Sequence, residues 1–222
     1  MMSLISDLIQ AFRYVQNQQG WRYAFSLSIK ALTLPFFEYR RGFLVHRSLE
    51  EPIHIPAPRA AVTVREATLD DLALLETIVP RLRLSRIVKK MQTGEICFVA
   101  IQDQRVVGYV FGGFANTPST EDAQLKLGPK EAYAWGGYVL PQYRRQGVWG
   151  AVHLALCRRQ QEDGYESCFG LVDRHNRAAL GALQKIGFHV PGRVTLLRVL
   201  GWRMSRWLPT EDLVREPAIE RE

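Results

Sequence analysis

Apolar positions follow two different spacings along this chain, and each spacing predicts a different kind of element. Apolar residues three and four positions apart are typical of an amphipathic helix, whereas alternation or a short apolar run between turn formers is typical of a strand. Helical spacing covers five stretches, residues 1–35, 68–79, 80–92, 148–159 and 176–186. Strand patterns cover seven stretches, residues 36–49, 62–65, 96–101, 106–111, 133–140, 167–172 and 188–200. The pattern therefore predicts an α/β chain.

Short local signals place the turns and ends of these elements. Thr68, followed three residues later by Asp71, fits a capping box at the start of a helix. Residues 103–104 are predicted to form a tight turn between two strands, and residues 191–192 to separate a final extended pair. Glycines at positions 136 and 137 interrupt an apolar strand, which favours a β-bulge or the close approach of another backbone.

A proline-rich stretch divides the chain into unequal parts. Prolines at positions 52, 56 and 58 mark a linker. We expect residues 1–58 to form an N-terminal segment of helix, strand and linker, residues 59–201 to form the main domain, and residues 202–222 to be a charged, partly ordered tail. The apolar face of the N-terminal helices could pack on the main domain, pair with another subunit in a homodimer, or lie on a membrane surface.

Composition narrows the class of protein. With 222 residues, of which 47% are hydrophobic and 23% charged, the chain matches ordinary folded domains and not disordered ones. Its 29 basic and 22 acidic residues give a net charge of +7, which suits an anionic ligand, anionic lipid or nucleic acid. No recognisable reader motif accompanies the charge, so nucleic acid is not expected as a partner. The basic residues in the 80–92 stretch fit a solvated helix face or, alternatively, an acidic partner.

The cysteines and the amino terminus indicate the compartment. Cys97, Cys157 and Cys168 are widely spaced in apolar runs, which predicts three buried, reduced thiols in a cytoplasmic protein and no metal site. The first residues lack a basic segment before the apolar ones and include Asp7, which argues against a secretory signal. There is also no apolar stretch of 18 residues that would predict a membrane span.

One strand-to-helix junction carries features of an anion-binding site. The apolar strand that ends at Leu140 is followed by a short turn and then at once by a helix. A helix start offers unpaired main-chain N–H groups and the positive end of the helix dipole. Gly147 and Gly150 remove side chains that would hold a phosphate away, while Arg144 and Arg145 add charge. An ordinary turn with solvated arginines is the alternative interpretation.

Two motifs in this region resemble those of the GNAT superfamily of acetyl-CoA-dependent N-acetyltransferases. Val139-Leu140-Pro141 followed by Gln142 to Gly147 fits the family's phosphate-binding motif, except that Trp149 stands where the family has Gly or Ala. The second motif runs from Asn176 to Lys185-Ile186-Gly187-Phe188. The resemblance covers roughly residues 61–200. It implies a mixed α/β (α+β) fold with a mainly antiparallel central sheet and helices on both faces, here with an N-terminal helical extension.

The resemblance also implies how acetyl-CoA would bind, with no metal. Main-chain amides just after the turn would hold the pyrophosphate. Those amides belong to Arg145, Gln146, Gly147, Val148, Trp149 and Gly150. Tyr138 and Val139 would pair with the pantetheine amides, and Val139 would also direct an N–H at the thioester oxygen. Asn176 would sit beside the pantetheine arm, although a plain helix cap is its alternative role.

Members of this family let the acceptor amine attack the thioester directly. An alkylammonium group with a pKa of ~10.4 is not a nucleophile, so a base or a chain of waters must remove its proton. Glu131, Tyr133 and His175 are the candidates, with Glu95 as a further one. A Tyr that often protonates the leaving thiolate has no counterpart here, because its position is Leu183.

The resemblance therefore predicts an N-acetyltransferase acting on an amine acceptor, such as an anionic small molecule or sugar precursor. Two alternatives stay open. One is a GNAT-like protein without catalysis that docks on a membrane or partner, and the other is an N-acyltransferase that uses a longer acyl donor.

Overall fold

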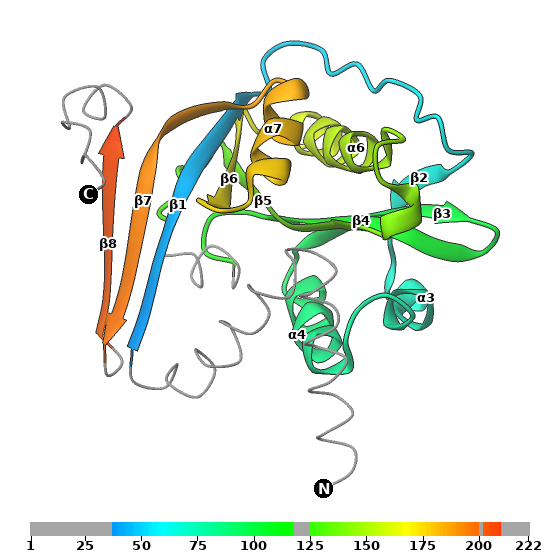
Figure 1. Ribbon diagram of the computed structural model, residues 1–222, viewed down its shortest axis with the longest axis horizontal. Coiled ribbons are helices and arrows are strands. Elements are labelled where there is room, and N and C mark those ends of the chain that lie inside the picture. The colour runs from blue at the N-terminus through cyan, green and yellow to red at the C-terminus, as the bar shows by residue number, and fades with distance from the viewer. Residues whose placement is uncertain (1–36, 118–124, 200–201, 210–222) are drawn as a thin grey trace, which may run out of the picture.

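The computed structural model describes residues 37–117, 125–199 and 202–209, which together build an eight-stranded sheet (Figure 1). The strands are β1 (Phe37–Ser48), β2 (Thr63–Glu66), β3 (Ile96–Gln102), β4 (Arg105–Gly113), β5 (Glu131–Val139), β6 (Ser167–Asp173), β7 (His189–Val199) and β8 (Trp202–Pro209). The helices within these ranges are α3 (Leu72–Glu76), α4 (Arg81–Gln92), α6 (Val148–Glu162) and α7 (Arg177–Lys185), with the 3₁₀ turns η1 (Leu69–Asp71) and η2 (Pro141–Tyr143). The predicted helical stretch 1–35 lies outside the described residues.

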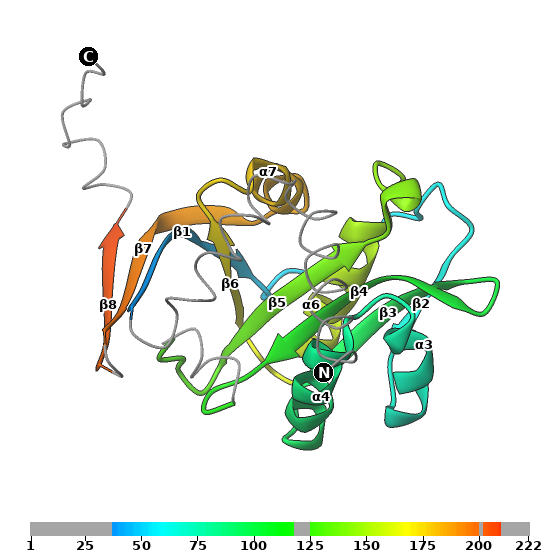
Figure 2. The ribbon, with the colours of Figure 1, turned by 60° about the horizontal axis from the view of Figure 1, so that its bottom comes forward.

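The sheet is mixed, with a single parallel pair among the described strands. Its order is β2-β3-β4-β5-β6-β1-β7-β8, and every neighbouring pair is antiparallel except β5 with β6. Helices α6 and α7 lie on one face, whereas α3 and α4 lie on the other (Figure 1, Figure 2). This architecture confirms the predicted α/β fold with a mainly antiparallel sheet and helices on both faces.

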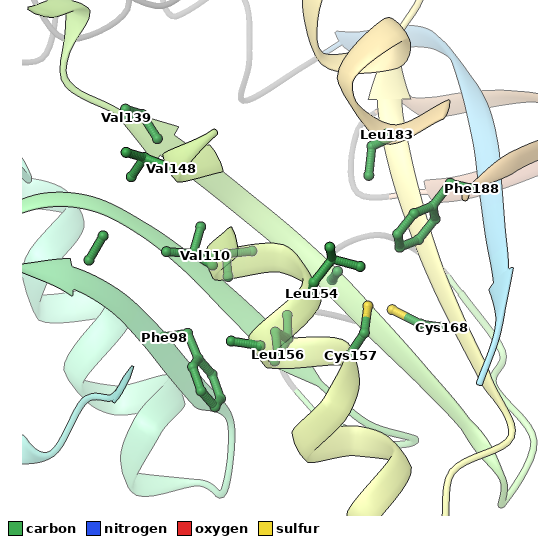
Figure 3. Packing of buried hydrophobic residues seen from close by; sticks show 14 of the residues in the cluster. Phe98, Val110, Val139, Val148, Leu154, Leu156, Cys157, Cys168, Leu183 and Phe188 are labelled. Carbon is green, nitrogen blue, oxygen red and sulfur yellow. The ribbon is translucent and has the colours of Figure 1, made fainter. Parts of the chain in front are cut away.

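Two apolar clusters hold the helices on the sheet. On one face, Leu154 of α6 packs with Leu183 of α7 and with Phe188 (Figure 3). On the other face, Leu75 of α3 and Ile87 of α4 belong to a second cluster built on β3, β4 and β5. Full burial of one such side chain contributes about 1.5–3 kcal/mol, so both helix layers are held mainly by these contacts.

The three cysteines are buried and form no disulfide, as the sequence predicts. The sulfur atoms of Cys157 and Cys168 face each other between α6 and β6 (Figure 3). A hydrogen bond between these two thiols, together with burial, raises the pKa of Cys168. Within the described ranges, no helix is long and apolar enough to cross a membrane, and no three His, Cys, Asp or Glu side chains gather as metal ligands would.

Several local signals act as predicted. Thr68 and Asp71 form a capping box at the start of η1. Residues 103–104 turn from β3 into β4, and both have positive φ angles, 47° and 58°, as a tight hairpin turn requires. Asn176 is the N-cap of α7, and Gly187 just after that helix has a φ of 88°. Each of these features depends on a few neighbouring residues, which explains why the sequence alone predicts them.

The strand β1 is hydrogen-bonded inside the sheet, between β6 and β7. After β1, the segment 49–62, called the strap below, runs along α6 and leads to β2 (Figure 1). Arg158 of α6 donates a hydrogen bond of 2.7 Å to the carbonyl of Ile53, and Gln161 donates to the carbonyl of Leu49. Residues 37–58, which the sequence pattern assigns to an N-terminal segment and linker, thus share the sheet and helix layer of the main domain.

Two sequence predictions near the C-terminus are wrong in detail. Residues 189–199 form one strand, β7, instead of an extended pair separated at residues 191–192. The register passes from Leu44–Gly192 to His46–His189, so Pro191 lies in a bulge where its missing N–H interrupts no ladder bond. Residues 202–209 form strand β8 on β7 instead of beginning a tail. The rest of the predicted tail, residues 210–222, lies outside the described residues.

Candidate functional site

The two ends of β5 have different neighbours. Residues 131–134 pair with β6, and residues 133–134 also pair with β4 on the other side. Residues 135–139 pair with β4 alone, because the register with β6 ends at Ala134–Gly170 and the rest of β6 pairs with β1. We call residues 135–139 the open edge of β5. Main-chain groups on such an edge need partners from outside the sheet.

A bulge lies where the open edge begins. Three steps on β5, from Trp135 to Tyr138, face two steps on β4, from Phe111 to Tyr109. Gly136 has a φ of 69°, which a residue without Cβ adopts at no steric cost. At Gly137, a Cβ atom would lie 2.4 Å from Cε1 of His153, so α6 packs directly on the strand backbone. The structure thus confirms the predicted bulge, while the group that closely approaches Gly137 is the His153 side chain and not another backbone.

The register decides which main-chain groups face the open edge. The N–H of Leu140 donates to the carbonyl of Val107 at 2.9 Å, and hydrogen-bonded pairs alternate along an antiparallel ladder. The N–H and C=O of Tyr138 therefore face β4, whereas those of Val139 face the open edge. In agreement, Nε of Arg144 donates to the carbonyl of Val139 at 3.2 Å. Of the two predicted strand residues, Val139 presents its main chain to the open edge, while Tyr138 is buried against the ring of Tyr109.

The turn between η2 and α6 exposes a run of amides. Arg145 and Gly147 both have positive φ angles, 62° and 84°, which redirect successive peptide groups. In the part of the chain that the structure describes, the main-chain N–H groups of residues 145–150 donate no hydrogen bond, and the first donor of the helix is Ala151. We call these six N–H groups the amide cradle. Together with the positive end of α6, they form a seat for an anion.

The strap supports the cradle from one side. The N–H of Arg59 donates to the carbonyl of Gln146 at 2.8 Å, and a Cβ at Gly147 would lie 3.2 Å from Cα of Pro58. In a trans peptide, the C=O of Gln146 and the N–H of Gly147 point in opposite directions. The N–H of Gly147 therefore points away from the strap, toward the side where a ligand could bind.

A stacked pair from α6 lies beside the open edge. The rings of Trp149 and His153 have centroids 3.5 Å apart and planes 25° apart. Nδ1 of His153 lies 2.9 Å from the carbonyl of Trp149, which can only accept, so Nδ1 carries the proton. Burial lowers the pKa of His153 to about 4, so the imidazole is neutral at physiological pH and its Nε2 is an acceptor.

The sequence analysis missed His153. Its signal is a single polar residue in the apolar run 148–157, one turn after Trp149, a pattern that also fits a core histidine. Trp149, which stands where the family has Gly or Ala, leans on His153 toward Gly137, where a Cβ would lie 3.2 Å from the indole Nε1. The indole thus lies beside Gly137 of β5.

The end of β6 lies opposite the open edge. Because β5 and β6 are parallel, residues 173–176 belong to the same end of the sheet as Val139. Asp173 accepts hydrogen bonds from the main-chain N–H of His175 at 2.9 Å and from its Nδ1 at 3.1 Å. The side chain of Asn176 accepts from the N–H of Ala179 at 3.1 Å. Asn176 therefore caps α7, and its contact with a pantetheine arm stays a prediction.

The other catalytic candidates lie elsewhere. Glu131 and Tyr133 are six to eight residues before Val139, roughly 20 Å or more along the strand. Glu131 accepts a hydrogen bond of 2.8 Å from the N–H of Gly128, and Tyr133 is buried. Glu95 is buried on the α4 face, where it accepts a hydrogen bond of 2.9 Å from Nε1 of Trp135. Of the three candidates Glu131, Tyr133 and His175, His175 is the one that the fold brings to the open end.

Known proteins provide a family assignment and fold neighbours. The family model described as acetyltransferase (GNAT) family matches residues 66–188. A solved Drosophila protein shares 14% identity over 81% of this chain and 58% of its own, with a TM-score of 0.57. A GCN5-related N-acetyltransferase from Sphaerobacter thermophilus shares 15% identity over 78% of this chain and 56% of its own, with a TM-score of 0.54. A GNAT acetyltransferase from Colwellia psychrerythraea shares 15% identity over 78% and 62%, with a TM-score of 0.53.

At these identities the neighbours support the fold, and the chain spans less than two thirds of the length of each of them. Among curated proteins, no sequence matches the chain. The family model covers more than half of the 222 residues and includes the bulge, the open edge and the amide cradle. The chain therefore belongs to the GNAT acetyltransferase family.

Proposed function

We propose that the chain is an acyl-CoA-dependent N-acyltransferase that moves an acetyl group from acetyl-CoA directly to an amine. The observation that carries this proposal is the open edge of β5, which ends at the amide cradle. A strand edge without a neighbour suits an extended chain with amide groups, and six free amides at a helix start suit a diphosphate. Coenzyme A joins these two features in one molecule.

In this proposal the pyrophosphate binds the cradle, with the exposed side chain of Arg145 nearby. The pantetheine arm then follows the open edge and takes the place of the missing strand. The N–H of Val139 faces this edge and would donate to the pantetheine arm.

Proton removal from the amine is assigned to His175 through water. An alkylammonium with a pKa of ~10.4 must lose a proton before it attacks. Nδ1 of His175 bonds to Asp173 and Nε2 accepts from Nε of Arg174 at 3.1 Å, which orients the imidazole at the open end. The side chain is exposed, and water would replace Arg174 at Nε2 when the ring takes up a proton. No acyl-enzyme is needed, because the thioester carbon passes straight from sulfur to nitrogen.

We further propose an acceptor with an anionic group, bound from the α4 face. Arg83 and Lys90 are half-buried and directed toward the bulge, whereas Arg86 and Lys89 on the same helix are exposed. Nη2 of Arg83 lies 3.6 Å from the position of a Cβ at Gly136, and Nζ of Lys90 lies 4.4 Å from the ring centre of Trp135. These positive charges favour a phosphate or carboxylate on the acceptor, as in a sugar phosphate.

Calorimetric titration with acetyl-CoA, followed by a thiol-release screen over amine acceptors, tests the proposal. We expect saturable binding that weakens in Arg145→Ala and thiol release with at least one class of amine. Absence of binding by any acyl-CoA would contradict the proposal. Competition between acetyl-CoA and palmitoyl-CoA distinguishes a short acyl donor from a longer one.

A second candidate function is acyl-CoA binding without transfer. Two departures from the family favour it: Trp149 replaces a small residue, and Leu183 replaces the Tyr that protonates the thiolate. Leu183 is buried in the apolar cluster under α7, so it supplies packing at that position (Figure 3). Tight binding of acetyl-CoA without thiol release for any amine would select this alternative. Membrane docking through residues 1–36 is tested separately by vesicle flotation of the full chain.

A further inference from the structure

His153 is buried beside the open edge of β5. Neither the family motifs nor the proposed reaction assigns a role to this residue. It is 4% exposed, and it is the one buried histidine in the described ranges. Its Nδ1 is bound to the carbonyl of Trp149. Its Nε2 has no hydrogen-bond partner among the described residues, although a Cβ at Gly137 would lie only 2.7 Å from it. Nε2 is not one of the fully covered polar atoms that lack a partner, so it keeps some exposure and can accept a hydrogen bond from a ligand.

We propose that Nε2 of His153 accepts a hydrogen bond from the amide N–H nearest the sulfur of the acyl donor. The inference rests on the proposed function and adds a side-chain contact for the donor arm. Trp149 acts as a positioning residue, because its carbonyl fixes the imidazole tautomer and its ring holds the imidazole plane.

The order of groups along the site supports this choice of amide. The amide cradle lies beyond the C-terminal end of β5, so an arm that starts there passes Val139 before it reaches Gly137. The part of the arm closest to the sulfur is therefore the part that comes to His153. Gly137 and Val139 are one two-residue repeat apart, roughly 6.6 Å, which the few bonds between the two arm amides span.

The balance of donors and acceptors supports the hydrogen bond itself. The pantetheine arm carries two amide N–H donors, and each loses water when it enters a gap between protein elements. On the open edge the carbonyl of Val139 already accepts from Arg144. Nε2 of His153 is a further acceptor beside this edge, and a hydrogen bond to it would keep an arm N–H from being buried without a partner.

The test compares acetyl-CoA with an analogue in which an ester oxygen replaces the N–H of the amide nearest the sulfur. Calorimetry gives the dissociation constant of each for the wild type, His153→Phe and His153→Gln. Phe keeps the stacking and removes the acceptor, whereas the Gln amide oxygen can restore it. His54→Phe, an exposed histidine of the strap, is the matched control.

We expect the wild type and His54→Phe to bind acetyl-CoA roughly three- to tenfold more tightly than the ester analogue. His153→Phe should bind both ligands equally, and His153→Gln should regain part of the difference. An undiminished difference in His153→Phe, or equal binding of both ligands by the wild type, would overturn this inference alone. Failure of the wild type to bind any acyl-CoA would overturn the proposed function as well. The wild-type comparison needs no variant, so it holds even where His153→Phe folds poorly.

Discussion

The paired end and the open edge of β5 belong to one strand but leave their main-chain groups in opposite states. Residues 131–134 have ladder partners on β6, and residues 133–134 have partners on β4 as well, so the sheet itself pairs the main chain at this end of the strand. Residues 135–139 have a partner on one side only, and the groups of Val139 face the other side. The same backbone thus stabilises the fold at one end and is available to a ligand at the other.

The difference between the two ends of β5 also explains which candidate site residues lie close together. Glu131 and Tyr133 have suitable chemistry but sit on the paired end, where they are held by the fold. Val139, His153 and His175 lie at the end where β5 and β6 diverge. The position of the missing ladder bonds is therefore a better guide to this site than residue type, because it shows where a ligand can replace a strand.

The largest expected effect concerns the cradle next to the open edge. Gly147 and Gly164 flank α6 and have nearly the same φ, 84° and 87°. Ala at either position costs about 1–2 kcal/mol through left-handed strain. Gly147→Ala should in addition turn cradle amides away from the diphosphate and weaken acetyl-CoA binding roughly thirtyfold, about 2 kcal/mol. Calorimetry and thermal unfolding of both variants measure these effects.

Gly164→Ala is the matched control, since a Cβ there meets nothing within 4 Å and lies at the far end of α6. It should lose similar stability but bind acetyl-CoA within about twofold of the wild type. Equal loss of binding in both variants would mean that strain in α6, and not the cradle, controls donor affinity.

Much of the fold and the cradle follows from short stretches of sequence. The capping box at Thr68, the turn at residues 103–104 and the bulge at Gly136 each depend on residues next to one another. The cradle is predictable for the same reason, because glycine, a helix start and a preceding strand are local features. The function suggested by these residues needed the resemblance to a family as well.

The remaining features depend on contacts between distant parts of the chain. Insertion of β1 between β6 and β7 is decided by long-range register, which a strand pattern does not contain. Residues 204–207 of strand β8 are exposed, since β8 pairs with β7 alone among the described strands, and an exposed edge strand is hard to tell from a tail by sequence. His153 becomes informative only when Gly137, on a different strand, is known to lie against it.

A smaller effect, on stability, is expected when Asp71 is replaced. Asp71 binds Arg65 through two hydrogen bonds of 2.6 and 2.7 Å and also accepts from the N–H of Thr68. The hydrogen bond from Arg65 is the main cause that lowers the pKa of Asp71 to about 2. A lowered carboxyl pKa stabilises the fold at neutral pH, and this stability is lost as pH falls from about 5 toward 2.

Asp71→Asn should therefore reduce the free energy of unfolding at pH 7 by about 1–2 kcal/mol, a range that allows for solvent screening of the half-exposed Arg65. The gap to the wild type should narrow as pH is lowered to 2. Acetyl-CoA binding should not change. Urea unfolding across this pH range is the measurement, with the exposed Asp70→Asn as control. A gap independent of pH would assign the loss to packing or capping instead of charge.

The smallest expected effect is a gain in stability, whereas the first substitution, Gly147→Ala, causes a loss. Gly181 lies inside α7, the helix that follows β6, and a Cβ there meets nothing within 4 Å. Its φ is not positive, so Ala fits the helix and lowers the entropy of the unfolded chain. Gly181→Ala should raise the free energy of unfolding by about 0.5–1 kcal/mol, seen as a higher melting temperature, with unchanged acetyl-CoA binding. Tighter or weaker binding in this variant would show that α7 moves when the donor occupies the open edge. The division between a stabilising paired end and a ligand-binding open end would then have to include helix motion.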